Sequence, residues 1–238
     1  IRRLAREYAG TRPSAIRIGV ALERHRGGGQ TIRAVSCLPA LVGAWRDVGG
    51  GMLALSVWEH PYRFDQMCRA DWIPPGTRVI SNLKIGRHLT NEIPMDPPIL
   101  SMMCWNTNPV TQAPECDKIV AGLMREDLFL VVADHFVSDT ARYADIVLPA
   151  AMGAEMEDII LAWGHNYLTY NARCVEPPGE AVSNAELFRR LARRFGFTDE
   201  RLYWSDDECL RNFVAWDAPA CAGISLERLR AQGYARLQ

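Results

Sequence analysis

The stretch VVADHFVSDTARYADIVLPAA, from Val131 to Ala151, decides the fold that we predict for this chain. The apolar run Leu128–Val132 indicates a buried strand, and a second strand begins at Ile146–Leu148. Between them, Ser138–Asp139 can cap a short helix. Parallel strands need a crossover of about a dozen residues, which fits this spacing. Asp134 then follows the carboxyl end of a strand, where open parallel sheets bind their ligands.

The same alternation of strand, polar turn and helix continues upstream. Ile99–Cys104 predicts a strand, the segment Trp105–Pro114 a turn, and the spacing of Ile119, Val120, Leu123 and Met124 a helix with one apolar face. The turns at 105–108, 133–138 and 149–155 should therefore meet at one edge of the sheet. We predict an α/β fold with a doubly wound, mostly parallel, Rossmann-like sheet.

A second strand-to-helix unit is predicted near the amino terminus. A helix over Arg2–Tyr8 precedes a strand over Ile16–Leu22. The glycine-rich segment Glu23–Gln30 leads into a helix that we expect Gly49–Gly51 to close. Consecutive glycines let backbone N–H groups approach a phosphate at a helix start, and a plain turn is the alternative.

The middle and the end of the chain differ in regularity. Six prolines fragment residues 58–98, so we predict a long irregular insertion or lid, with one short strand at Arg78–Leu83. An amphipathic helix follows through Leu187–Phe195 and ends at Gly196, before two weaker helices. The predicted division is 1–57 for the first βα part, 58–98 for the insertion, 99–198 for the nucleotide-binding part and 199–238 for a helical extension.

Composition excludes several classes of function. The chain is 48% apolar and 23% charged with a formal net charge of −1, which gives no basic face for a nucleic acid partner. The seven cysteines form no CxxC pair, so no zinc or iron–sulfur site is encoded here, and their use favours a reducing compartment, cytoplasmic over periplasmic. No apolar run of about 18 residues exists, so no direct membrane insertion is expected. Four arginines between 189 and 194 form a solvated face or an anion-binding patch.

No catalytic or metal-ligating residue can be identified from motifs. The five histidines lie far apart, and no GxSxG or Walker sequence occurs, so any chemistry must come from a cofactor. Asn108, which precedes Pro109, offers an amide at a strand end, or simply makes an Asx turn. The Asp134 carboxylate can accept from sugar hydroxyls, or from the N1–H and exocyclic amine of a guanine.

Four segments together resemble, in the same order, the molybdopterin oxidoreductases of the dimethyl sulfoxide reductase superfamily. They are LERHRGGGQTIRAVSCLPALVGAWRDVGGG, the NPVTQAPE turn, VVADHFVSDTARYADIVLPA and PPGEAVSNAELFRRLARRFG. The resemblance implies an internal segment of a large catalytic subunit that carries a bis(molybdopterin guanine dinucleotide) cofactor with molybdenum or tungsten. It also implies a 4Fe–4S cluster in a missing amino-terminal part and, with it, electron-transfer subunits as partners.

The resemblance also assigns roles to residues of this chain. This chain departs from the family at two positions, since the family often has Gln where Arg24 stands and Lys where Met156 stands. The metal ligand belongs to a part of the family's chain that is absent here, so no residue of this segment is expected to be catalytic. The cofactor-binding residues implied are Arg24 and His25 near the pterin and diphosphate, Asn108 at the strand end, Ala133 with Asp134 at the guanosine, and Asn184 to complete the pocket.

We therefore expect a fragment of an oxidoreductase that binds and orients the cofactor and is inactive as an isolated segment. Two alternatives stay open. The chain could be part of a cofactor-free structural or electron-relay subunit, as in respiratory complex I, or a free-standing nucleotide-binding module. Neither the substrate nor the choice between molybdenum and tungsten follows from the sequence.

Overall fold

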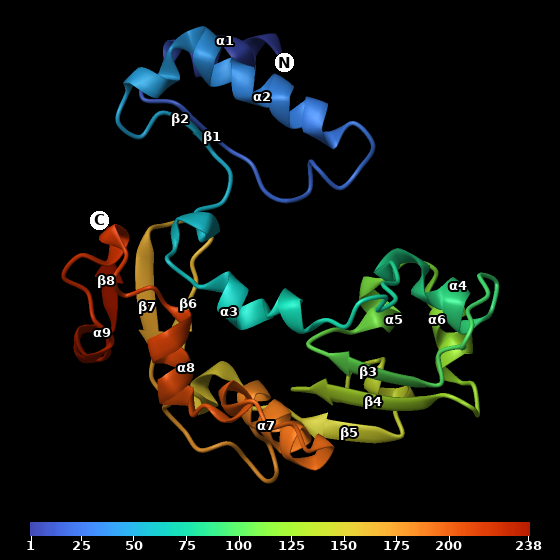
Figure 1. The fold of residues 1–238 in the computed structure, drawn as a ribbon. Helices are drawn as coiled ribbons and strands as arrows, with labels where there is room; N and C mark the ends of the chain where they lie inside the picture. The colour runs from blue at the N-terminus through green and yellow to red at the C-terminus, as the bar shows by residue number, and fades with distance from the viewer. The chain divides into compact units, whose positions relative to one another are not determined.

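The computed structural model describes residues 1–238 and shows a mixed α/β chain with parallel sheets (Figure 1). The chain divides into two compact units. None of the helices combines the length and the apolar character that crossing a membrane requires. The first unit comprises Ile1–Pro61, Ile160–Thr169 and Trp216–Gln238, and the second comprises Tyr62–Ile159 and Tyr170–Ala215.

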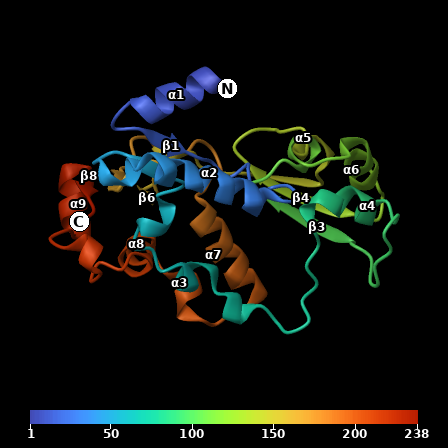
Figure 2. The ribbon, with the colours of Figure 1, turned by 90° about the horizontal axis from the view of Figure 1, so that it is seen from above.

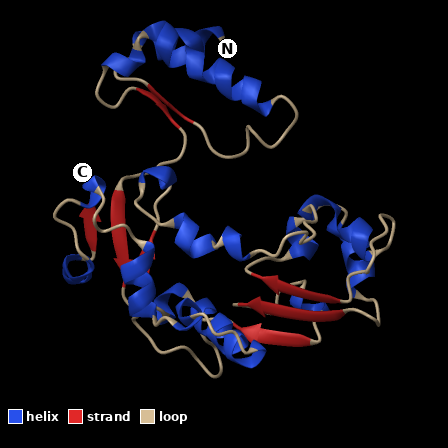
Figure 3. Ribbon diagram, viewed as in Figure 1, coloured by secondary structure: helices blue, strands red, loops and turns tan.

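The second unit is built around a three-stranded parallel sheet of order β3-β4-β5. Met103 pairs with Val131, and Val131 pairs with Ile146, which fixes the register across all three strands. The three arrowheads point the same way, so the three carboxyl ends share one edge of the sheet (Figure 3). The strands are β3 (Ser101–Trp105), β4 (Phe129–Asp134) and β5 (Ile146–Pro149).

One face of this sheet carries the core of the second unit. Leu130 and Val132 are fully buried and lie two residues apart, so both side chains point to the same face of β4. Ile119 of the helix that covers this face is also fully buried, and Cys104 of β3 joins them. The covering helices are α4 (Ile85–Leu89), α5 (Pro109–Gln112) and α6 (Cys116–Leu123).

Helix α4 lies within the stretch that the sequence predicts to be irregular. It packs against α6 (Figure 2). The two helices lie so close that a Cβ added at Gly122 would be 2.3 Å from the Cβ of Leu89. Leu89 is only 1% exposed, so this part of 58–98 belongs to the core. The predicted strand at Arg78–Leu83 is wrong, because Asn82–Lys84 forms a single 3₁₀ turn that leads directly into α4.

Three further helices of the second unit are α3, α7 and α8. Ser183 caps α7 by accepting a hydrogen bond from the Glu186 N–H, and Gly196 ends the helix with a φ of 73°, as the sequence predicts. The backbone N–H of Arg63 donates to the Phe213 carbonyl at 2.8 Å, which ties the segment before α3 to the end of α8. Their bounds are α3 Phe64–Cys68, α7 Asn184–Phe195 and α8 Asp206–Phe213.

The amino-terminal part of the first unit is one β–α–β element. Strands β1 (Ala15–Arg17) and β2 (Gly51–Leu53) pair in parallel, and α2 (Gly28–Val42) connects them after α1 (Arg2–Gly10). The observed strand is thus shorter than the predicted Ile16–Leu22, because the chain enters a turn at Val20.

The predicted end of helix α2 is also wrong. The helix ends at Gly43, which has a φ of 66°, rather than at Gly49–Gly51. Gly51 instead begins β2, where a Cβ would lie 2.4 Å from the Trp45 ring. The glycine is required there by close approach to an indole and by its φ of 104°.

The remaining strands form a third sheet of order β6-β7-β8. Strands β7 and β8 pair antiparallel, with Leu168 opposite Ala235. Leu168 and Leu229 of α9 are fully buried. The bounds are β6 Asp158–Ile160, β7 Tyr167–Asn171, α9 Leu226–Gln232 and β8 Tyr234–Arg236.

Candidate functional site

A small polar pocket lies where the strands of the second unit end. Its volume is about 30 Å³, close to that of one or two water molecules. The turns that follow β3, β4 and β5 each contribute to its wall, which confirms the prediction that they meet at one edge of the sheet. The lining residues are Asn106, Ala133, Asp134, His135, Ala150 and Asn184.

Asp134 is the charged group of this pocket. It is the last residue of β4 and is half-buried. Its Oδ1 accepts a hydrogen bond from the backbone N–H of His135 at 2.7 Å, and its own carbonyl accepts from the Ala150 N–H at 3.1 Å. Because the backbone is held on both sides, the carboxylate keeps a defined direction while Oδ2 stays available to a ligand.

Two amide side chains face the same space. Asn106 follows β3 with a φ of 55°, in the left-handed region that asparagine tolerates better than most residues. Asn184 is the first residue of α7. An amide can both donate and accept a hydrogen bond, so the pocket combines one carboxylate, which accepts, with two amides, which can do either.

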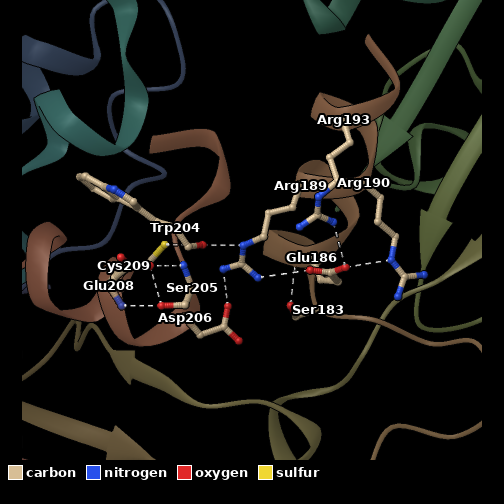
Figure 4. A network of polar contacts seen from close by, with 10 residues as sticks. All are labelled: Ser183, Glu186, Arg189, Arg190, Arg193, Trp204, Ser205, Asp206, Glu208 and Cys209. Carbon is tan, nitrogen blue, oxygen red and sulfur yellow. Dashed lines mark hydrogen bonds and ion pairs between the residues drawn. The ribbon is translucent and has the colours of Figure 1, made fainter. Parts of the chain in front are cut away.

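The position of Asn184 depends on how α7 begins. Ser183 Oγ accepts from the Glu186 N–H at 3.2 Å, and the Glu186 carboxylate pairs with Arg190 at 3.0 Å and with Arg193 at 3.7 Å (Figure 4). The hydrogen bond from Arg190 holds the pKa of Glu186 below its ordinary value. A carboxylate in the first turn also interacts favourably with the helix dipole.

Arg189 anchors the same helix from its buried side. It is 9% exposed, and it donates from Nε to the Trp204 carbonyl and from Nη2 to Asp206 Oδ1, each at 2.6 Å (Figure 4). Arg189, Arg190 and Arg193 therefore pair with carboxylates of this unit. These contacts fix the helix whose first residue lines the pocket.

Asn108 lies near the pocket but is not part of its lining. Its Oδ1 accepts from the backbone N–H of Thr140 at 3.2 Å and from the Thr140 hydroxyl at 2.6 Å. Thr140 is fully buried, and its hydroxyl oxygen accepts in turn from the Val110 N–H. The amide oxygen of Asn108 thus joins the turn after β3 to the turn after β4.

Arg24 and His25 lie in the first unit, in the turn before α2. Both are exposed and make only local contacts, Arg24 Nε with the Val20 carbonyl at 3.0 Å and His25 Nδ1 with the Arg26 carbonyl at 3.0 Å. A Cβ added at Gly28 would lie 2.3 Å from the Leu22 carbonyl oxygen, so only glycine fits this turn. Helix α2 has neither a side-chain cap nor an acidic residue in its first turn. The N–H groups of Gly28 and Gln30 donate to the carbonyls of His25 and Gly27, each at 3.0 Å, so the Gly29 N–H is the one that is left for an anion.

The structure thus brings together Ala133, Asp134 and Asn184, and it adds Asn106 and His135, which sequence reasoning did not select. Both of these are polar residues within one or two positions of a strand's carboxyl end, and that placement is the signal that could have found them.

Comparison with known proteins places the whole arrangement in a family. A family model described as molybdopterin oxidoreductase matches residues 4–194. The chain belongs to the molybdopterin oxidoreductase family. This family includes dimethyl sulfoxide reductase DmsA of Escherichia coli, which is 26% identical over 258 aligned positions that cover 97% of this chain and 31% of DmsA.

Other members of the molybdopterin oxidoreductase family are more similar in sequence. The probable oxidoreductase YoaE of Bacillus subtilis is 39% identical over 236 residues, 98% of this chain and 34% of YoaE. The F420-dependent formate dehydrogenase subunit alpha of Methanocaldococcus jannaschii is 33% identical over 126 residues, 53% of this chain and 18% of that subunit.

A solved structure shares the fold. Acetylene hydratase from Pelobacter acetylenicus matches with a TM-score of 0.70 at 20% identity, covering all of this chain and 37% of that one. The chain spans about a third of the length of the curated relatives that it matches from end to end.

Proposed function

We propose that this chain binds and orients a bis(molybdopterin guanine dinucleotide) cofactor within a longer oxidoreductase. The observation that carries the proposal is the pocket at the carboxyl edge of β3-β4-β5, where Asp134, Asn106 and Asn184 present one carboxylate and two amides. In open parallel sheets this edge is the usual place for a nucleotide.

The chemistry of these side chains fits the edge of a guanine. The Asp134 carboxylate can accept from the N1–H and the exocyclic amine, and an amide N–H of Asn184 or Asn106 can donate to the O6 carbonyl. Adenine presents an acceptor at N1, which the Asp134 carboxylate would repel, whereas an amide could turn to accept from the exocyclic amine. The carboxylate is therefore the group that would distinguish the two bases. A pocket of about 30 Å³ suits the edge of a base rather than the whole ring.

The turn before α2 fits the charged part of such a cofactor. Gly28 leaves no room for a side chain, the Gly29 N–H has no partner within the chain, and Arg24 and His25 lie beside it without distant partners. These features support contact with a diphosphate or with the pterin. We assign this role to the first unit and the guanine edge to the second.

The cofactor, when bound, would supply the redox chemistry at molybdenum or tungsten. The residues of this chain hold and orient it, and none of them is assigned to catalysis. We further propose that the metal ligand and a 4Fe–4S cluster belong to other parts of a longer polypeptide, that electron-transfer subunits accompany it, and that the 238 residues alone are inactive.

The test is a calorimetric titration of the 238-residue protein with GDP and with ADP. We expect GDP to bind more tightly, and Asp134→Asn to reduce that preference about tenfold or more, because it removes a charged acceptor. Asp139→Asn is the matched control, since Asp139 is exposed in the same turn and outside the pocket. Equal affinity for the two nucleotides in the unmodified protein would contradict the proposal.

A further inference from the structure

His135 links the two chain segments that flank Asp134. Its ring Nε2 lies 3.1 Å from the carbonyl oxygen of Ala151, the second residue after β5. Ala151 is 1% exposed, and its own N–H donates to the Val182 carbonyl at 2.9 Å. Val182 comes two residues before Asn184, so hydrogen bonds connect His135 through Ala151 to the segment that leads to Asn184 in the lining of the pocket.

The contact with Ala151 defines the proton on the imidazole. A carbonyl oxygen can only accept, so Nε2 must carry the hydrogen. In the neutral ring, Nδ1 is then an acceptor, and it has no partner within the chain. The side chain is therefore tied at one nitrogen only, and its role in this contact is that of a single N–H donor.

The backbone of the same residue holds the carboxylate. The His135 N–H donates to Asp134 Oδ1 at 2.7 Å, which leaves Oδ2 for a ligand. One residue thus fixes the direction of the carboxylate through its main chain and fixes the turn itself through its ring. The Ala150 N–H adds a bond of 3.1 Å to the Asp134 carbonyl on the other side of the turn.

We propose that His135 is a positioning residue that sets the discrimination between guanine and adenine at this pocket. The inference rests on the proposed function, because it concerns how the Asp134 carboxylate is presented to the base. Without the ring contact, the turn after β4 is held to the β5 side by the Ala150 bond alone. The carboxylate then meets the two guanine donors in a wider range of directions.

The experiment compares two variants of the 238-residue protein in GDP and ADP titrations. His135→Phe keeps a planar ring but removes the donor, and we expect the preference for GDP over ADP to fall about fivefold. His135→Gln places an amide N–H near the position of Nε2, and we expect it to restore most of the preference. The ratio of the two affinities is the readout, because a general loss of structure weakens both nucleotides alike.

The outcomes separate this inference from the proposal on which it rests. If the unmodified protein shows no preference for GDP, or if Asp134→Asn leaves that preference unchanged, both fail. If Asp134→Asn abolishes the preference while His135→Phe retains it in full, only the role of His135 is overturned. If the Phe and Gln variants lose the preference equally, the N–H donor is not what matters, and the inference is again overturned.

Discussion

The two parallel sheets of this chain follow the same pattern of strand, turn and helix, but they differ in how firmly their turns are held. In the second unit, β4 buries Leu130 and Val132 completely, and the turns after its strands are joined by side-chain hydrogen bonds. In the first unit, β1 and β2 have three residues each, and none of the residues of β1 is buried.

The two candidate binding surfaces therefore differ in how far they are preorganised. The pocket beside Asp134 is preorganised by a core and by contacts between distant segments. The turn at Arg24 and His25 has contacts of short range only, so its side chains must pay conformational entropy when they bind. We expect specificity for the ligand to come from the former and general attraction of an anion from the latter.

Deleting a core side chain should give the largest effect. Leu130→Ala should lower the free energy of unfolding by about 2–5 kcal/mol, because Leu130 is fully buried in the second unit. Leu41→Ala in α2, where the leucine is 80% exposed, should change it by less than about 0.5 kcal/mol. Urea unfolding of both variants checks the comparison, and equal losses would show that the two regions do not differ as described.

Replacing a helical glycine by alanine should change the free energy of unfolding in opposite directions at two positions. Gly122→Ala should destabilise by about 1–3 kcal/mol, because the new Cβ would meet Leu89 at 2.3 Å where α6 packs on α4. Gly29→Ala in α2 meets nothing within 4 Å and should stabilise by about 0.5 kcal/mol through helix propensity. Thermal unfolding measures both, and a stabilising Gly122→Ala would contradict the close contact of α4 with α6.

The smallest effect concerns pH. The hydrogen bond from Arg87 lowers the pKa of Glu115 from 4.5 to about 2, with a second contribution from Lys118. A depressed pKa in the folded state contributes stability above pH 4.5 that is lost as the pH falls toward about 2. The side chains of Arg87 and Glu115 are 46% and 28% exposed, so solvent screens the pair and the contribution is small.

Glu115→Gln should therefore flatten the loss of stability on acidification below about pH 4.5. Glu126→Gln is the control, because Glu126 is exposed and forms no ion pair. Unfolding midpoints followed from neutral to acid pH provide the measurement. Identical acid profiles for the unmodified protein and Glu115→Gln would rule out this contribution.

The sequence predicts the parts of the second unit that depend on local patterns. The apolar run Leu128–Val132 and the capped helix ending at Gly196 occur close to where they are expected. Helix α4 could not be predicted in the same way, because it is five residues long and is stabilised by its approach to Ile119 and Gly122, more than 30 residues away. Local periodicity does not contain such contacts.

The residues of the candidate site also differ in whether local sequence can identify them. Asp134 at a strand end could be identified from its position, and Asn184 only from resemblance, because about 50 residues separate it from the strand. For Asn108, the sequence left a ligand contact and a turn open, and its amide oxygen engages Thr140. The link from His135 to Ala151 depends on a ring orientation that no sequence pattern encodes.

Trp105 is the last residue of β3 and directly precedes Asn106. Its indole and the Phe188 ring of α7 form a T-shaped pair, with 5.0 Å between the ring centroids. It therefore adjoins both the strand and the helix that bring amides to the pocket. We expect a ligand in the pocket to change the surroundings of this indole, because Trp105 adjoins Asn106 of the lining. The difference in emission between the unmodified protein and Trp105→Phe would follow ligand entry without any added label.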